Sequence, residues 1–116
     1  MMQKLAFTVS GDSGVAEVSV SKAGGPVLMN VNRWRGQLGM KPLKASSELD
    51  LEETSVSGQP GLLAELHGES KSSVVVMVPA SAPRWFIKLN GDTEVVKQQT
   101  AAFRQYLTTI RIAEYQ

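Results

Sequence analysis

Apolar and polar residues alternate along the beginning of the chain. Leu5, Phe7 and Val9 take every second place, and a glycine-containing polar stretch at 10–14 separates them from a second alternating run at 15–21. Period-two alternation is typical of a strand with one buried face, and a short glycine-rich connection makes two such strands antiparallel neighbours. The chain is therefore predicted to begin with a β-hairpin.

After a pair of glycines at 24–25, the periodicity changes to that of a helix. Pro26 suits the first helical position, because an N–H group there has no partner inside the helix, and Gly39 suits the C-terminal cap. The apolar positions between them share one arc at about 100° per residue: Val27, Val31, Trp34 and Leu38. We therefore predict a helix over 26–38 with its tryptophan in the core.

Four short apolar runs follow, separated by turn-forming residues. The predicted strands span 51–57, 62–67, 73–78 and 84–89, and the turns after them span 58–61, 68–71, 79–83 and 90–91. Connections this short make neighbouring strands antiparallel, because a parallel return needs a crossover of a dozen or more residues. The run at 73–78 is mostly apolar at successive positions, so we expect it at the centre of the sheet. Alternation in the last run places Trp85, Ile87 and Leu89 on one face and Phe86 with Lys88 on the other.

A second helix is predicted to close the chain. Its apolar stripe recurs at helical spacing and comprises Val96, Phe103, Leu107 and Ile110. Asp92 or Thr93 is expected to cap its N-terminus. The element order ββα-ββββ-α predicts a single α+β domain over 1–116, in which helices pack against an antiparallel sheet of about six strands as a layered sandwich.

The polar positions of the first helix are the candidate binding residues. One flank of the apolar arc carries Asn30, Arg33 and Gln37, and the other flank carries Asn32 and Arg35. The two arginines point about 160° apart, so they do not form a single phosphate clamp; contact with backbone carbonyls of neighbouring loops is favoured for them. The stripe of asparagine, arginine and glutamine offers donors, acceptors and a guanidinium fork for a partner's carboxylate or carbonyl groups. Bracing of nearby loops is an equally good interpretation of that stripe.

The amino-acid composition excludes or disfavours most kinds of catalytic and metal site. The chain has no cysteine, which excludes disulfides, thiolate metal sites and cysteine nucleophiles, and its net charge of +1 gives no attraction to nucleic acid. His67 is the only histidine, and the acidic stretch at 48–53 lacks the spacing of a calcium loop. Trp34 and Trp85 are expected in the core rather than on a base-stacking platform. We therefore expect no catalytic residue, cofactor, metal site or nucleic-acid partner, and no transmembrane segment, since no run approaches about 20 apolar residues.

Two segments resemble an uncharacterised bacterial domain family. NVNRWRGQLG at 30–39 and WFIKLNG at 85–91 fit its patterns NVNRWRxQLG and WFxKLxG, and Phe103 fits the late phenylalanine of its final helix. Family members look like exported envelope proteins or lipoproteins. The layered arrangement is similar to the PsbP-like fold, shared by an extrinsic photosystem subunit and a Ran-binding nuclear-import factor. The resemblance implies non-catalytic binding or assembly.

The leading hypothesis is a non-enzymatic binding or assembly module for a protein partner in the bacterial envelope. Its contact surface is expected to be the stripe of Asn30, Arg33 and Gln37 with the glycine loop at 24–25. The alternative is a small-molecule or anion-binding domain that uses the same stripe, and a third reading is a structural domain without a site. The N-terminus shows no signal-peptide pattern, so an envelope location requires an export signal upstream of Met1, and otherwise we expect a cytoplasmic protein.

Overall fold

The computed structural model describes residues 3–11, 14–22, 24–83 and 85–109, with the backbone alone described for 3–11. Its helices are α1 (Val27–Gln37) and α2 (Thr93–Leu107), and a 3₁₀ turn covers Ser46–Glu48. Its strands are β1 (Gln3–Gly11), β2 (Gly14–Lys22), β3 (Glu52–Val56), β4 (Gln59–His67), β5 (Lys71–Val78) and β6 (Trp85–Asp92). The α+β class, with helices packed on an antiparallel sheet, is confirmed.

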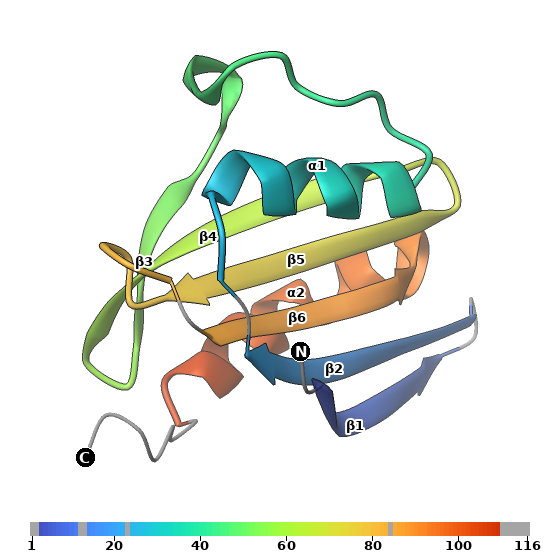
Figure 1. Ribbon diagram of the computed structural model, residues 1–116. Coiled ribbons are helices and arrows are strands. Elements are labelled where there is room, and N and C mark those ends of the chain that lie inside the picture. Colours follow the sequence, from blue (N-terminus) through green and yellow to red (C-terminus); the bar gives the residue numbers. More distant parts are fainter. Residues whose placement is uncertain (1–2, 12–13, 23, 84, 110–116) are drawn as a thin grey trace.

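All strands join one antiparallel sheet in the order β1-β2-β6-β5-β4-β3 (Figure 1). β3 to β6 follow one another as the predicted meander. The N-terminal hairpin then adds to the outer edge of β6, with Val18 opposite Leu89. Gly91 permits this pairing, because a Cβ at that position would lie 2.4 Å from the carbonyl oxygen of Val15. The hairpin thus becomes part of the main sheet and leaves β1 and β3 at its edges.

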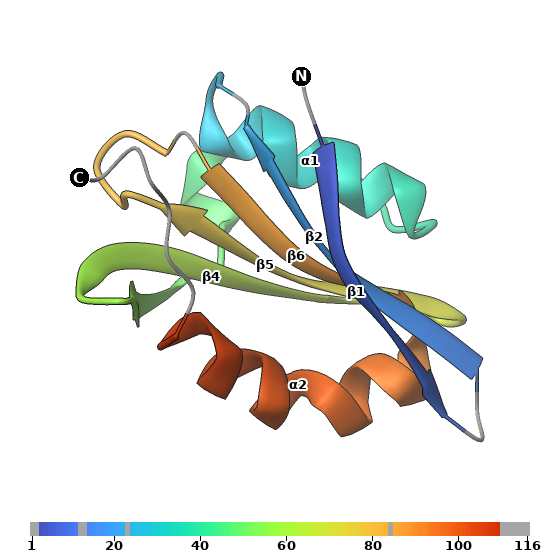
Figure 2. The same ribbon diagram turned by 90° about the horizontal axis from the view of Figure 1, so that it is seen from below.

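The helices cover opposite faces of the sheet (Figure 2). β5 lies near the centre and is buried on both sides, as predicted. Its residues Val74, Val76 and Val78 belong to the core beneath α2, which also contains Ile87 and Phe103. The core beneath α1 contains Val31, Trp34, Ala64, Leu66, Val75, Met77 and Phe86. The alternation predicted for β6 is confirmed, since successive residues of this strand enter the two different cores.

The first helix ends as its glycine predicted. Gly39 has φ +75°, and the helix closes with hydrogen bonds from Gly39 N to Gly36 O and from Met40 N to Arg35 O. This paired closure is the Schellman arrangement, which favours glycine at the left-handed position. Trp34 is 3% exposed and meets the ring of Phe86 edge to face, with the centroids 5.2 Å apart. Its predicted place in the core is confirmed.

Two predicted turns are wrong. The stretch 58–61 is expected as a four-residue turn, but β3 and β4 are joined through Ser57 (φ 49°) and Gly58 (φ 88°), and Pro60 lies inside β4. Two successive positive φ values suit the twist of a tight hairpin. Pro60 precedes Leu62, where β4 begins to pair with β5, so its missing N–H costs no bond to that strand. The stretch 90–91, predicted as a turn, continues β6 because its partners β2 and β5 extend that far.

The predicted cap of the second helix is right in its position but not in its hydrogen bond. Asp92 occupies the N-cap position, but no side-chain cap is formed. Instead, Asp92 Oδ2 accepts the N–H of Val15 at 2.8 Å, and its Oδ1 pairs with Lys71. Thr93 Oγ1 donates to the carbonyl of Gly68 at 3.1 Å. Both side chains therefore tie the start of α2 to neighbouring strand connections.

In the predicted stripe of this helix, Val96, Phe103 and Leu107 are buried, and Ile110 lies outside the described residues.

Candidate functional site

Two cations from different elements flank the indole ring of Trp34. Arg33 precedes it on α1, and the guanidinium carbon Cζ lies 5.8 Å from the ring centroid. Lys88 reaches the same ring from β6, with its Nζ 5.9 Å from the centroid. Each contact is within the range of a cation–π interaction. We call these three residues the dibasic surface; it joins one member of the predicted stripe to a lysine far away in sequence.

The positive charge of the dibasic surface is opposed by Glu17, but from beyond ion-pair distance. Among the residues that the structure describes, no carboxylate oxygen lies within 4.0 Å of a side-chain nitrogen of Arg33 or Lys88. Burial lowers the pKa of the half-buried Lys88 amine, the charge of Arg33 lowers it further, and Glu17 opposes this effect. Like charges repel more strongly where water is partly excluded. An anionic group placed between the two cations would therefore be stabilised.

A polar strip of the sheet continues from the dibasic surface. Ser19 lies opposite Lys88 across β2 and β6, and Glu17 lies opposite Asn90. From the other side, Ser73 of β5 pairs with Asn90 and donates a hydrogen bond to its Oδ1 at 2.6 Å. Directly opposed residues share a face of an antiparallel sheet, so these side chains lie on the α1 side. α1 itself lies in front of β4 and β5, to one side of the strip (Figure 1).

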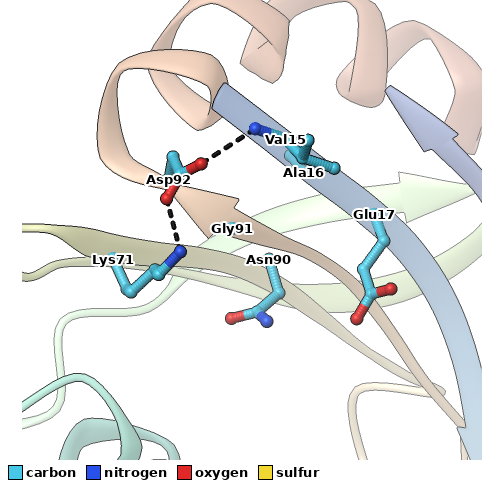
Figure 3. A pocket seen from close by; sticks show the side chains of 7 residues that line it. All are labelled: Val15, Ala16, Glu17, Lys71, Asn90, Gly91 and Asp92. Atoms are coloured by element: carbon cyan, nitrogen blue, oxygen red, sulfur yellow. Dashed lines mark hydrogen bonds and ion pairs between the residues drawn. The ribbon is translucent and has the colours of Figure 1, made fainter. Parts of the chain in front are cut away.

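The polar strip ends in a cavity of about 270 Å³ near the start of α2. Glu17 and Asn90 project to one side of neighbouring strands, and the amine of Lys71 turns to Asp92 (Figure 3). At its rim, the contacts with Lys71 and with the N–H of Val15 hold the pKa of Asp92 below its usual value. The cavity is lined by both donors and acceptors, which suits it to polar contacts.

Asn30, the first member of the predicted stripe, serves the protein's own backbone. It is 1% exposed, and its Nδ2 donates to the carbonyl oxygens of Gly24 and Pro26, each at 3.2 Å. Its Oδ1 is buried and has no hydrogen-bond partner among the described residues. Asn30 therefore braces the glycine loop at 24–25, while Gln37, at the other end of the stripe, is exposed. The stripe is not one continuous contact surface.

Asn32 and Arg35 lie on the opposite flank, as the helical spacing predicted. Asn32 makes two hydrogen bonds with the backbone of Leu43: its Nδ2 donates to the carbonyl at 3.0 Å, and its Oδ1 accepts the N–H at 2.7 Å. Arg35 Nε donates to the carbonyl of Lys41 at 2.8 Å. The interpretation of a loop-directed arginine is thus right for Arg35, whereas Arg33 lies on Trp34 instead.

Sequence reasoning missed the sheet half of the site. Lys88 and Asn90 interrupt an otherwise apolar strand, and alternation alone places them on the same face as Phe86. The lysine at an inward-facing position of this strand was therefore the one feature of the sequence that could have pointed to the sheet half of the site. Its proximity to Arg33 could not be seen, because it depends on how α1 crosses the sheet.

The remaining titratable clusters of the described chain look structural. Arg104 of α2 pairs with Glu52 and Glu65, with nitrogen–oxygen distances of 2.6 and 2.8 Å, and His67 Nε2 lies 3.1 Å from Glu65. These contacts join α2 to β3 and β4. Within residues 14–22, 24–83 and 85–109, no three metal-ligating side chains gather as a metal site would require. No helix of the described chain is long and apolar enough to span a membrane.

Fold and site together define an α+β domain that carries an uncompensated dibasic surface beside a polar strip. Comparisons with protein-family models, with curated proteins and with solved structures found no match to this chain. The functional argument therefore rests on the residues themselves.

Proposed function

We propose that this protein is a non-enzymatic binding or assembly module that captures an acidic segment of a protein partner on the dibasic surface. The observation that carries this proposal is the pair Arg33 and Lys88, held on one indole with no carboxylate within 4.0 Å among the described residues. Each cation gains from its contact with the indole ring, but the repulsion between the two like charges works against the fold. An anion that contacts both cations would remove this repulsion.

An extended protein segment suits the site better than a small substrate. The cations lie at one end of a strip that continues through Ser19, Asn90 and Glu17 to the cavity at the start of α2. A partner segment could place a carboxylate between the cations and its backbone amides near Asn90 and Glu17, since Ser19 is only 3% exposed. The resemblance to the envelope-associated family, and with it a PsbP-like fold, agrees with this role and favours a bacterial envelope location.

A small-anion site is the second candidate, supported by the same two cations on the Trp34 ring, because a small anion needs no extended strip to contact them. In that case a phosphate or carboxylate metabolite would occupy the dibasic surface. The two candidates differ in what saturates the site: an acidic peptide or a simple anion.

The test is a titration of the ¹⁵N-labelled protein with a blocked tetraglutamate peptide, with tetraglutamine as the uncharged control. Trp34 and Trp85 lie on opposite faces of the sheet, so their indole N–H signals provide a reporter and an internal control. We expect saturable shifts at Trp34 with tetraglutamate only, and a binding constant that falls as salt rises. Arg33→Ala and Lys88→Met should each weaken binding about fivefold.

Lys97→Ala is the matched charge-removal control, because Lys97 is exposed on α2 at the other face. It should leave the titration unchanged. Saturation of Trp34 by sodium phosphate, with no response to tetraglutamate, would replace the proposal by the small-anion candidate. Unfolding of Arg33→Ala would show that Arg33 is structural, and equal binding by all variants would reject the dibasic surface.

A further inference from the structure

A second cavity, of about 180 Å³, lies on the opposite flank of α1 from the dibasic surface. It is enclosed by α1, by β4 and by the segment 38–51, which arches away from the end of α1 before entering β3 (Figure 1). Its apolar lining is formed by Val31, Leu43, Leu49, Leu51, Ala64 and Leu66. Leu43, Leu49 and Leu51 are only partly buried, so their side chains are accessible to a ligand.

The wall of this cavity is held in place by hydrogen bonds from α1. Asn32 makes two hydrogen bonds with the backbone of Leu43, and Arg35 Nε holds the carbonyl of Lys41. Glu48 Oε1 accepts the backbone N–H groups of Lys44 and Ala45, at 2.8 and 3.0 Å. These bonds hold both the first and the second half of the segment 38–51, so the cavity is formed before a ligand binds. A preformed cavity lowers the entropy cost of binding.

Charges of both signs border the same cavity without pairing to each other. Arg35 lines it from α1, and Glu48 with Asp50 lines it from the segment. Within the described chain, no carboxylate oxygen lies within 4.0 Å of a nitrogen of Arg35. Glu65 also lines the cavity, but its carboxylate is already bound to Arg104 and His67. Around its apolar floor the cavity therefore offers one cation, the carboxylate of Asp50, and the second oxygen of Glu48, whose Oε1 already accepts two backbone N–H groups.

We propose that this cavity binds a small zwitterion with a short apolar tail, of the size and chemistry of a free aliphatic α-amino acid. The ligand carboxylate would contact the guanidinium of Arg35, and its ammonium group would contact Asp50 and Glu48. The tail would lie on the leucines. An apolar cavity of roughly 150 Å³ accommodates benzene, so 180 Å³ suits a branched side chain of a few carbons. This site does not depend on the dibasic surface or on a protein partner.

The test uses three probes that share one apolar tail: L-leucine, 4-methylpentanoate, which lacks the ammonium group, and isoamylamine, which lacks the carboxylate. Binding is followed by the methyl signals of Leu43, Leu49 and Leu51, with Val18 and Val96 of the opposite core as the control. We expect saturable shifts with L-leucine in the millimolar range or tighter, and at least fivefold weaker binding of each partial probe.

Two charge variants separate the ends of the ligand. Arg35→Gln should weaken L-leucine and 4-methylpentanoate at least fivefold and leave isoamylamine unchanged. Asp50→Asn should weaken L-leucine and isoamylamine several-fold and leave 4-methylpentanoate unchanged. The amide signal of Leu43 reports whether the segment is still held by Asn32 in each variant, so a general loss of structure is recognised.

Three results would overturn the proposal: no saturable shift with L-leucine, equal binding of all three probes, or L-leucine binding that neither variant weakens. Shifts that appear at the Trp34 indole instead of the leucine methyls would also overturn it, because they would assign the ligand to the dibasic surface. None of these outcomes bears on the tetraglutamate titration, so the two proposals fail separately.

Discussion

The two faces of the sheet use their charged residues in opposite ways. On the α2 face, Arg104 is paired with carboxylates of two different strands, Glu52 and Glu65, and so joins the helix to the sheet. On the α1 face, Arg33 and Lys88 share an indole but have no carboxylate partner within 4.0 Å among the described residues. Charges that join elements contribute to the fold, whereas adjacent like charges oppose it. The α1 face is therefore where a partner is expected.

The first way to test this contrast is to remove the largest apolar contact of the α2 face. Phe103→Ala deletes a side chain that is 2% exposed in the core under α2. We expect the free energy of unfolding to fall by about 3–5 kcal/mol, measured by urea denaturation. Lys97→Ala, an exposed change on the same helix, should stay within about 0.5 kcal/mol. A small effect of the phenylalanine change would mean that α2 contributes little to the core.

On the α1 face, the strongest polar restraint is the side chain of Asn32. Asn32→Ala removes both hydrogen bonds to the backbone of Leu43 and should cost about 1–2 kcal/mol. Hydrogen exchange should then accelerate in 38–51 and remain slow in α2, because the two faces have separate cores. Uniform acceleration across the chain would show instead that the faces unfold together.

The paired charges of the α2 face predict a loss of stability in acid. Arg104 lowers the pKa of Glu52, and for Glu65 burial raises the pKa but Arg104 and His67 more than offset it. A depressed folded pKa means that the stabilisation is present above the unfolded value of 4.5 and is lost as pH falls through the folded pKa. Arg104→Met should lower the Tm by a few degrees at neutral pH. The Tm of this variant should also fall less steeply than that of the wild type as the pH is lowered. If the Tm of both proteins fell equally steeply with falling pH, Arg104 would not be the cause of the lowered pKa values of Glu52 and Glu65.

On the α1 face, the charge of Lys88 should reduce stability rather than add to it, and its effect on the Tm should be the smallest of the predicted effects. Burial and then Arg33 lower the pKa of Lys88 in the folded protein, so the folded state binds fewer protons than the unfolded state. Stability from this residue is therefore reduced while Lys88 is charged and recovers as pH rises through its folded pKa towards 10.5. Lys88→Met should match or slightly exceed the wild-type Tm at pH 7, with the difference shrinking by pH 10. A clear destabilisation at neutral pH would show that the contact of Lys88 with the Trp34 ring outweighs the cost of burying its charge.

The sequence predicted elements and faces better than it predicted their junctions. Helical spacing placed Trp34 in the core and put Arg33 and Arg35 on opposite flanks, because spacing within one helix is independent of its surroundings. The assignments of 58–61 and 90–91 as turns failed, and Asp92 holds the N-cap position without capping the helix through its side chain. At these positions, neighbouring strands supplied partners that local preference does not include, such as the N–H of Val15 for Asp92.

The candidate site also has one part that the sequence predicted and one part that it did not. Its helical half, including Arg33, follows from the period of one element, and so does the loop-facing direction of Arg35. Asn30 matched the stripe by position but is buried against its own loop. The other half of the site depends on Lys88, which its alternation placed on the correct face without indicating what lies above it.

The amino-acid sequence by itself determined where each helix and strand lies, though not where the strands end, and which side of each faces inward, because periodicity acts over one or two turns or a few strand residues. Only the tertiary structure decided that the N-terminal hairpin pairs with β6 and that α1 crosses the sheet where Lys88 can reach Trp34. Such contacts join distant parts of the chain, and they form only where packing of both cores can be satisfied at once. The meeting of Arg33 and Lys88 is one consequence of that packing.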